Sequence, residues 1–483
     1  MALGLISLTG LAQADDSVSP PQSFSKADML ADLDYAWTTY ETYHAGLDRY
    51  RPRAEVKAEW DAAAADLPEE VSLEKAFLTL SKAAAAVQCG HTYANFYNQS
   101  NTVQSVLFDR SDKLPLAFKM VGGEALITAD VSGLEPSLKG HTIKSINGLL
   151  FEDLAAELAA YVKGDGDRPA VKLHDLTLTG QGKYEPFDIF QPLLAGPIDG
   201  AYQLTVETAD GKLETVTVDA ISRSDRSAKL PTADAKPWRL EIDGSTAVMS
   251  LDTFATWQFD FDWQDWYATS FGSLNKAGVD HLIIDIRRNS GGMDSAAGAL
   301  LGHIATMSLA IPFQKEVLLF DYIAEDQRDG LNTWDPTFYD WRDRVTATGD
   351  GRFQRTAGNV APLEIAANPN AFQGQVTLLI GPTNSSATFT LAKVLKASGR
   401  ATLLGEETGG AQRGITGGAY FFLQLPNTGL EVDVPLIGYF PEDWDTQPDA
   451  GVQPDILIAP SLADVRAGLD PVIERAREMY DLH

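Results

Sequence analysis

The stretch that decides the fold is HLIIDIRRNSGG, residues 281–292. A run of apolar residues followed by charged residues and two glycines is typical of a buried strand that ends in a tight loop. Gly291 and Gly292 let backbone N–H groups face a cleft, where such groups stabilise a developing oxyanion. An ordinary strand-to-helix turn would use the same residues, so this loop alone does not establish a functional site.

Strands and helices alternate on both sides of this stretch, from Pro237 onward. This order predicts βαβ units and a largely parallel sheet, so we expect an α/β core over residues 237–483. Residues 321–356 are aromatic and charged, and we interpret them as an insertion over the sheet edge. The predicted strands are 245–254, 279–287, 374–382 and 400–408, and the predicted helices are 263–278, 293–307 and 386–398.

Two further domains are predicted upstream of this core. Residues 26–105 have apolar residues at helical spacing, and residues 106–235 alternate apolar and polar residues with Gly-Gly and Asp-Gly at the turns. Residues 1–14, MALGLISLTGLAQA, are apolar and end in Ala-Gln-Ala, which is typical of a signal peptide. We therefore expect export to the periplasm or the extracellular space.

Composition excludes several partners. The chain has 67 acidic and 38 basic residues, a formal net charge of -29, so its surface repels nucleic acid and anionic lipid. Its single cysteine, Cys89, permits neither an intrachain disulfide nor a cysteine-built metal site. After residue 14 no segment approaches the ~18–20 apolar residues that cross a bilayer, so we expect no membrane span.

A second strand-to-helix loop and one histidine complete a possible set of catalytic groups. Ser385 and Ser386 precede a predicted helix, where the helix dipole favours an alkoxide, although serine is also the ordinary N-cap residue. His91 follows a glycine in AVQCGHTYANFYN, residues 86–98, and its imidazole titrates near neutral pH. Nucleophile, base and oxyanion donors are together the parts of an acyl-transfer site.

Three motifs in this order resemble the core of the tail-specific serine peptidases, which include the C-terminal-processing proteases and the tricorn core. They are LIIDIRRNSGG at 282–292, SSATFTLAKVLKASGRATLLGEETGG at 385–410 and GVQPDI at 451–456. The resemblance implies a ClpP/crotonase-like core with Ser386 as the nucleophile. It also implies an oxyanion hole of the Ala387 N–H with Gly291 or Gly292. Ser385 remains the alternative nucleophile.

The general base is the point where the chain departs from many members of this family. The family's lysine position is occupied by Ala411, and the neighbouring Arg413 stays protonated. Lys393 lies seven residues after Ser386, about 10 Å along a helix and beyond hydrogen-bond reach. CGHT at 89–92 is similar to the D-G-H-T of the histidine branch of the family, which implies His91 as the base. Cys89 paired with His91 is a rival nucleophile.

Two further assignments rest on the resemblance. Tricorn-type members carry a glutamate before the last motif, and here Asp449 is predicted to orient His91, with Asp445, Asp443 and Glu442 as alternatives. GHTIKSINGLLFEDL, residues 140–154, resembles a PDZ-type turn, so 106–235 is expected to be PDZ-like, or alternatively a plain β-rich cap.

The sequence therefore predicts a serine endopeptidase that cleaves unfolded proteins or peptides and needs no metal or organic cofactor. Activity should fall as the pH drops through the histidine pKa, about 6.5 if it is unshifted. A non-catalytic scaffold that binds peptides or apolar ligands is the alternative. Acyl-CoA chemistry of the crotonase type is disfavoured by the acidic charge. The sequence leaves the oligomeric state open.

Overall fold

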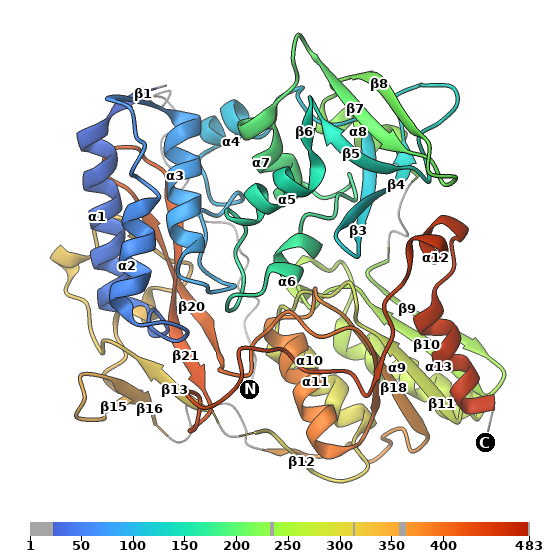
Figure 1. Ribbon diagram of the computed structural model, residues 1–483. Coiled ribbons are helices and arrows are strands. Elements are labelled where there is room, and N and C mark those ends of the chain that lie inside the picture. The colour runs from blue at the N-terminus through green and yellow to red at the C-terminus, as the bar shows by residue number, and fades with distance from the viewer. Residues whose placement is uncertain (1–22, 232–235, 313, 357–363, 482–483) are drawn as a thin grey trace.

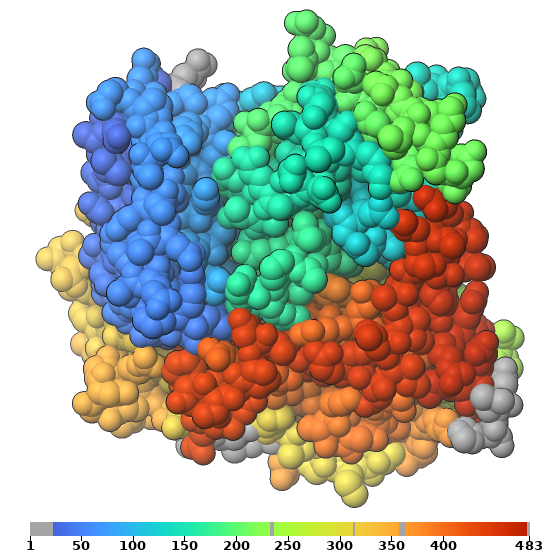
Figure 2. All heavy atoms as spheres, in the orientation of Figure 1, coloured from blue at the N-terminus to red at the C-terminus, as the bar shows by residue number. Residues whose placement is uncertain are grey.

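The computed structural model describes residues 23–231, 236–312, 314–356 and 364–481 of the chain. The predicted signal peptide, 1–14, lies outside the described residues. Among the described residues, no helix is long and apolar enough to cross a membrane. Figure 1 shows the arrangement of the elements, and Figure 2 shows the N-terminal helices, the middle of the chain and the C-terminal part meeting on one face.

The second half of the chain is organised around a six-stranded sheet of order β22-β19-β18-β11-β10-β9. Every neighbouring pair is parallel except β9 and β10, which confirms the predicted largely parallel sheet. The strands are β9 Trp238–Asp243, β10 Thr246–Leu251, β11 His281–Asp285, β18 Gln375–Ile380, β19 Thr402–Gly405 and β22 Ile456–Leu457.

Helices cover both faces of this sheet, which explains the uninterrupted apolar run in β11. Leu282 and Ile284 join the core beneath one set of helices, whereas Ile283 packs with Val472 and Ala476 on the opposite face. The helices are α9 Trp263–Ala277, α10 Asp294–Ile304, α11 Ser386–Ser398, α12 Leu462–Ala467 and α13 Pro471–Asp481.

A second six-stranded sheet, of order β14-β20-β21-β13-β16-β15, is antiparallel throughout. The interpretation of 321–356 as an insertion over the edge of the parallel sheet is wrong, because β14, β15 and β16 are strands of this second sheet. Its strands are β13 Lys315–Leu318, β14 Leu331–Asn332, β15 Val345–Ala347, β16 Phe353–Arg355, β20 Ile415–Gln424 and β21 Glu431–Phe440. The short elements nearby are β12 Leu309–Ala310, which pairs with β17 Glu364–Ile365, and the 3-10 turns η1 Thr256–Gln258, η2 Glu325–Gln327 and η3 Pro336–Tyr339.

The N-terminal helices pack against the second sheet (Figure 1). The Tyr40 hydroxyl donates to the Asp433 carbonyl at 3.2 Å, and the buried Asp32 carboxylate accepts from Asn427 and Thr428. The elements are α1 Lys26–Tyr43, α2 Arg53–Ala62, α3 Leu73–Ala85 and α4 Asn101–Leu107, with β1 Ser23–Ser25 paired to β2 Glu70–Ser72. These helices and the second sheet therefore share one apolar core.

The middle of the chain forms a six-stranded antiparallel sheet, of order β3-β4-β5-β7-β8 with β6 paired to β5, and four helices. Both predicted hairpins are present, and Asn147 and Gly148 form the predicted turn with positive φ angles of 51° and 80°. The strands are β3 Leu116–Val121, β4 Glu124–Asp130, β5 Thr142–Ile146, β6 Leu149–Leu150, β7 Ala201–Glu207 and β8 Leu213–Asp219. The helices are α5 Phe151–Ala159, α6 Pro169–His174, α7 Pro186–Ala195 and α8 Arg223–Lys229. The likeness of this region to a PDZ-type module stays a prediction.

Candidate active site

Ser386 occupies the first position of α11, directly after the loop that follows β18. Its φ of +51° is left-handed, a conformation that costs a serine energy and persists only where the surroundings enforce it. Such strained strand-to-helix turns present a nucleophilic side chain at the edge of a sheet. Ser386 is partly exposed and stands at the positive end of the helix dipole, as the sequence predicts.

The buried amide of Asn384 holds this loop in place. Its Nδ2 donates to the Asn289 carbonyl at 3.0 Å, and its Oδ1 accepts from the Gly381 N–H at 2.8 Å. Its own carbonyl accepts from the N–H groups of Gly409 and Gly410 at 2.8 and 3.0 Å. Asn384 therefore joins the serine loop to the loop after β11 through its fully buried side chain, and to the loop after β19 through its main-chain carbonyl.

The Gly-Gly loop is built for close approach to the serine loop. A Cβ atom on Gly291 would lie 2.9 Å from both the Ser386 Cβ and the Ser385 carbonyl oxygen. A Cβ on Gly292 would lie 2.2 Å from the Phe254 carbonyl carbon. The φ angles of the two glycines are 116° and 135°, so both the space and the backbone conformation require glycine.

Two N–H groups beside Ser386 are available as oxyanion donors. The Gly291 N–H donates to the Asn289 Oδ1 at 2.9 Å and is therefore already engaged. Within the described ranges, the N–H groups of Gly292 and Ala387 have no hydrogen-bond acceptor. Of the two glycines that the sequence suggested, Gly292 is thus the one with a free donor.

The loop carrying His91 is held on both sides of the histidine. The Gly90 N–H donates to Asp165 at 3.1 Å, and the Thr92 hydroxyl contacts His44 Nε2 at 2.9 Å. His44 Nδ1 accepts from the Gly46 N–H at 3.1 Å, so its Nε2 carries the proton and donates to Thr92. His44 is therefore a structural residue.

Asp165 joins the histidine loop to the serine loop. Its Oδ1 accepts from the Gly90 N–H and from Arg49 Nη2 at 2.8 Å, and its Oδ2 accepts a long hydrogen bond of 3.5 Å from the Ser385 hydroxyl. The side chains of Arg49 and Asp165 are each only 1% exposed. Sequence reasoning missed Asp165, because its context, KGDGDR at 163–168, indicates only a loop.

His91 is neutral at physiological pH. Burial lowers its pKa to about 4, and the negative charge of Asp165, which acts in the opposite direction, only partly compensates. The ring lies beside Tyr420 of β20, with centroids 6.1 Å apart. Its Nδ1 is buried and has no hydrogen-bond partner in the described part of the chain. A neutral imidazole with an unengaged nitrogen can accept a proton.

Asp449 supports the loop that carries Asp165. Its Oδ2 accepts from the Asp167 N–H at 3.0 Å, and a Cβ on Gly166 would lie 1.9 Å from its Oδ1. Among the described residues it makes no hydrogen bond with His91, and the same holds for Glu442, Asp443 and Asp445. No direct contact with His91 therefore supports the orienting role that the sequence predicts for Asp449.

Arg168 connects the same loop to the serine loop by a second route. Its Nη1 donates to the Gly409 and Gly410 carbonyls at 3.0 and 2.7 Å, and its Nη2 pairs with Glu407 at 2.8 Å. Because the N–H groups of Gly409 and Gly410 bond to Asn384, residues 165–168 are connected to the serine loop both directly, at Ser385, and through Asn384.

The rival catalytic groups are placed unfavourably. Cys89 is 1% exposed and burial raises the pKa of its thiol, so it is protonated and a poor nucleophile. Ala411, at the family's lysine position, is fully buried.

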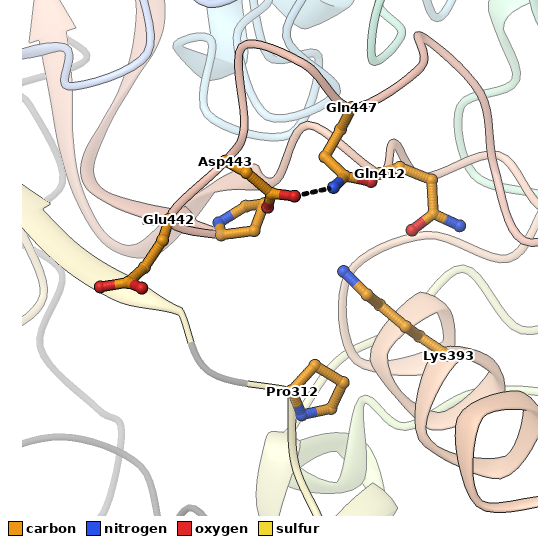
Figure 3. Close-up of a pocket in the computed structure, with 7 residues that line it drawn as sticks. Pro312, Lys393, Gln412, Glu442, Asp443 and Gln447 are labelled. Carbon is orange, nitrogen blue, oxygen red and sulfur yellow. Dashed lines mark hydrogen bonds between the residues drawn. The ribbon is translucent and has the colours of Figure 1, made fainter.

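Lys393 extends from α11 into a cavity of about 330 Å³ (Figure 3). Gln447 there donates to Asp443, and Ser386 is not among the lining residues. The cavity is lined by Pro312, Lys393, Gln412, Pro441, Glu442, Asp443 and Gln447.

These features bring a strained serine, unengaged backbone N–H groups and the histidine loop together at the carboxyl edge of a parallel α/β sheet. Residues 245–458 match the family model described as peptidase family S41. This stretch of the chain therefore matches the family of serine-type peptidases that the sequence motifs predicted.

Solved structures are similar over almost the whole chain. Mature CPAF complexed with lactacystin is 14% identical, with 95% of this chain and 98% of that chain covered and a TM-score of 0.64. A second structure of mature CPAF is 14% identical, with 94% and 96% covered and a TM-score of 0.63. The photosystem II D1 C-terminal processing protease is 15% identical, with 89% and 93% covered and a TM-score of 0.40. The likeness to CPAF concerns the fold.

Proposed function

We propose that this chain hydrolyses peptide bonds of unfolded proteins or peptides, with Ser386 as the nucleophile and His91 as the general base. The observation that carries the proposal is the left-handed Ser386 facing Gly291, with the free N–H groups of Gly292 and Ala387 nearby. An ordinary N-cap serine needs neither strained backbone nor unengaged donors.

The chemistry follows from these positions. His91 takes the hydroxyl proton as Ser386 Oγ attacks the substrate carbonyl, and the resulting oxyanion is stabilised by the N–H groups of Gly292 and Ala387. Protonated His91 then gives its proton to the leaving amine as the peptide C–N bond breaks. Water next attacks the acyl-enzyme and gives a proton to His91, which returns it to Ser386 as the product acid leaves.

Asp165 is a positioning residue in this proposal. It holds Gly90 beside the serine loop and keeps a negative charge near the imidazolium that forms during the reaction. Asp449 acts on His91 only indirectly, through residues 165–167. This assignment replaces the direct orienting role that the sequence suggested.

Hydrolysis of an unfolded protein by the wild type and by Ser386→Ala and His91→Ala tests the proposal, with Ser385→Ala as the matched control. We expect losses on the order of 10³-fold or more in the first two variants and a much smaller loss in the control. Equal turnover by the wild type and Ser386→Ala would overturn the proposal. No turnover by the folded wild type would favour the binding scaffold.

We propose in addition that the protein is exported, which residues 1–14 support by their apolar run and Ala-Gln-Ala end. Expression of the full chain in a bacterium with two membranes, followed by N-terminal sequencing of the periplasmic fraction, tests this. Cleavage near residue 14 is the expected result, and an uncut cytoplasmic chain would contradict it.

A further inference from the structure

A small cavity with polar groups lies next to the histidine loop, between α3 and the segment that joins α5 to α6. Its volume is about 60 Å³, several times the ~10–15 Å³ that one water requires. Apolar and aromatic side chains form most of its wall. Its lining residues are Ser81, Tyr93, Ala94, Phe96, Tyr161, Val162, Lys163, Asp175, Pro186 and Phe190.

Chain connectivity places this cavity beside the catalytic groups. Tyr93 follows His91 by two residues, and Lys163 precedes Asp165 by two residues, so each pair is at most about 7 Å apart along the chain. The Lys163 ammonium stands 3.8 Å from the centre of the Tyr93 ring. Since Asp165 contacts both Gly90 and Ser385, the Lys163–Tyr93 pair lies at the edge of the same site.

Burial lowers the pKa of the Lys163 ammonium, while the negative charges of Asp433, Asp175 and Asp165 nearby act in the opposite direction. In the described ranges, no carboxylate lies within ion-pair distance of the Lys163 Nζ. The nearby acids have other partners: Asp165 pairs with Arg49, and Asp433 accepts from Asn95 and Asn98 at 2.8 and 3.1 Å. Burial raises the pKa of Asp175 to about 7, so this carboxyl offers Lys163 only part of a charge at neutral pH.

A second donor in the cavity also lacks a partner. Ser81 is 3% exposed, and in the described part of the chain its buried hydroxyl has no hydrogen-bond partner. The Lys163 ammonium and the Ser81 hydroxyl can both donate to one small anionic acceptor such as a carboxylate, whereas the Asp175 carboxyl on the same wall favours such a group only when it is protonated. Tyr93, Tyr161 and Lys163 are partly exposed, which marks the open side of the cavity.

We infer that the cavity lined by Lys163 and Ser81 is a substrate subsite that binds a carboxylate of the peptide, either an acidic side chain or the chain terminus. The inference rests on the proposed peptidase function and names the substrate class of that same site. It gives a strongly acidic protein a local preference for anionic peptides that its overall charge would otherwise disfavour.

Matched peptides around one cleaved bond test the inference. One pair differs by glutamate or glutamine at each position near the bond, and the other by a free or amidated carboxyl terminus. We expect the wild type to prefer at least one carboxylate form by about tenfold in kcat/KM, the effect of one charge-assisted hydrogen bond. A preference in the first pair identifies a side chain, and one in the second identifies the terminus.

Variants locate the preference in the cavity. Lys163→Met should reduce the ratio of kcat/KM for the carboxylate form to that for the neutral form to about one. Ser81→Ala should reduce this ratio less. Lys183→Met is the matched control, because the Lys183 ammonium also lies over a tyrosine ring, at 4.8 Å from the centre of Tyr184, and its ratio should stay at the wild-type value.

Three outcomes decide between the hypotheses. A wild-type ratio near one for both peptide pairs, or an unchanged ratio in folded Lys163→Met, overturns the subsite while the peptidase function stands. If Lys163→Met does not fold, Lys163→Arg keeps the charge and should keep the preference, and its loss there would equally overturn the subsite. Failure of the wild type to cleave any peptide in a Ser386-dependent way would instead overturn the proposed function.

Discussion

The loops that carry Ser386 and His91 are built in opposite ways. The serine loop is held by residues at the ends of neighbouring parallel strands, chiefly the buried amides of Asn289 and Asn384. The histidine loop is held by Asp165 and Arg49, which come from different parts of the chain. The conformation of the serine loop is therefore determined mainly within one sheet, whereas that of the histidine loop depends on how three segments pack together.

This difference predicts different consequences of mutation. Damage to the serine loop should remove activity while most of the fold survives, because the sheet and its helices have their own core. Damage to the histidine loop should lower activity and stability together, because its polar contacts hold the N-terminal helices, the middle of the chain and the second sheet in register.

The largest expected effect on stability is that of Asp165→Ala. The variant leaves the buried Arg49 without its carboxylate, which typically costs about 3–5 kcal/mol in the free energy of unfolding. We expect activity to fall about hundredfold or more because Gly90 and the histidine loop lose their anchor. Urea unfolding and peptide hydrolysis measure the two effects. Asp167→Ala, an exposed aspartate in the same loop, should stay close to wild type, and equal behaviour of the two variants would refute the role of Asp165.

Gly291→Ala should lower activity strongly and stability less than Asp165→Ala does. The new Cβ would press on Ser385 and Ser386, which displaces the nucleophile and the oxyanion donors. We expect kcat to fall about 10²–10³-fold, with a stability loss of about 1–3 kcal/mol from the strained backbone. Gly298→Ala is the control, because on α10 its Cβ would meet only Ile365 at 3.9 Å. Full activity of Gly291→Ala would show that this close approach does not matter.

The acid limb of kcat/KM should lie at a lower pH than an ordinary histidine base would give. The base must be neutral to accept a proton, and burial lowers the pKa of His91 to about 4. The acid limb of kcat/KM should therefore lie well below the ordinary histidine value of about 6.5. Initial rates across the acid range, with recovery of activity after return to neutral pH, measure it. A reversible midpoint at 6.5 or above would mean that His91 is not the buried base described above.

The smallest expected effect is that of Asp449→Asn. The asparagine keeps an oxygen that accepts from the Asp167 N–H, so kcat/KM should change about threefold at most. A carboxylate that orients a catalytic histidine directly would instead cost about 10⁴-fold on this substitution. Steady-state kinetics of this one variant therefore separates the two roles, and a loss of the larger size would restore the assignment made from the sequence.

The fold of the half that contains the parallel sheet could be predicted because the sequence patterns that determine it are local. Strand–helix alternation, the Gly-Gly loop and the glycine that ends α9 each lie within one short segment, and the observed elements follow them. The engagement of the Gly291 N–H by Asn289 was not predictable, because it depends on a side-chain rotamer inside the loop.

The other half was harder because its partners are far apart in the sequence. The strands β13 to β16 are short, and β13 and β14 pair with β21 and β20 only after the chain returns from the parallel sheet, so 321–356 gave no periodic signal. Asp165 carries no motif, and its role arises only when Arg49, Gly90 and Ser385 converge on it. Asp449 accepts from the N–H of Asp167, two residues from Asp165, so the sequence prediction lay near the site but gave Asp449 a contact with His91 that is absent among the described residues.

The central claim is that Ser386 and His91, from these two differently built loops, act as one pair. The most direct measurement is the rate at which a fluorophosphonate modifies the protein at neutral pH, with the labelled residue identified by peptide mass, in the wild type and in His91→Ala. We predict a single label on Ser386, formed about hundredfold more slowly without the histidine. An equal rate in both proteins, or a label on Ser385 or Cys89, would contradict it.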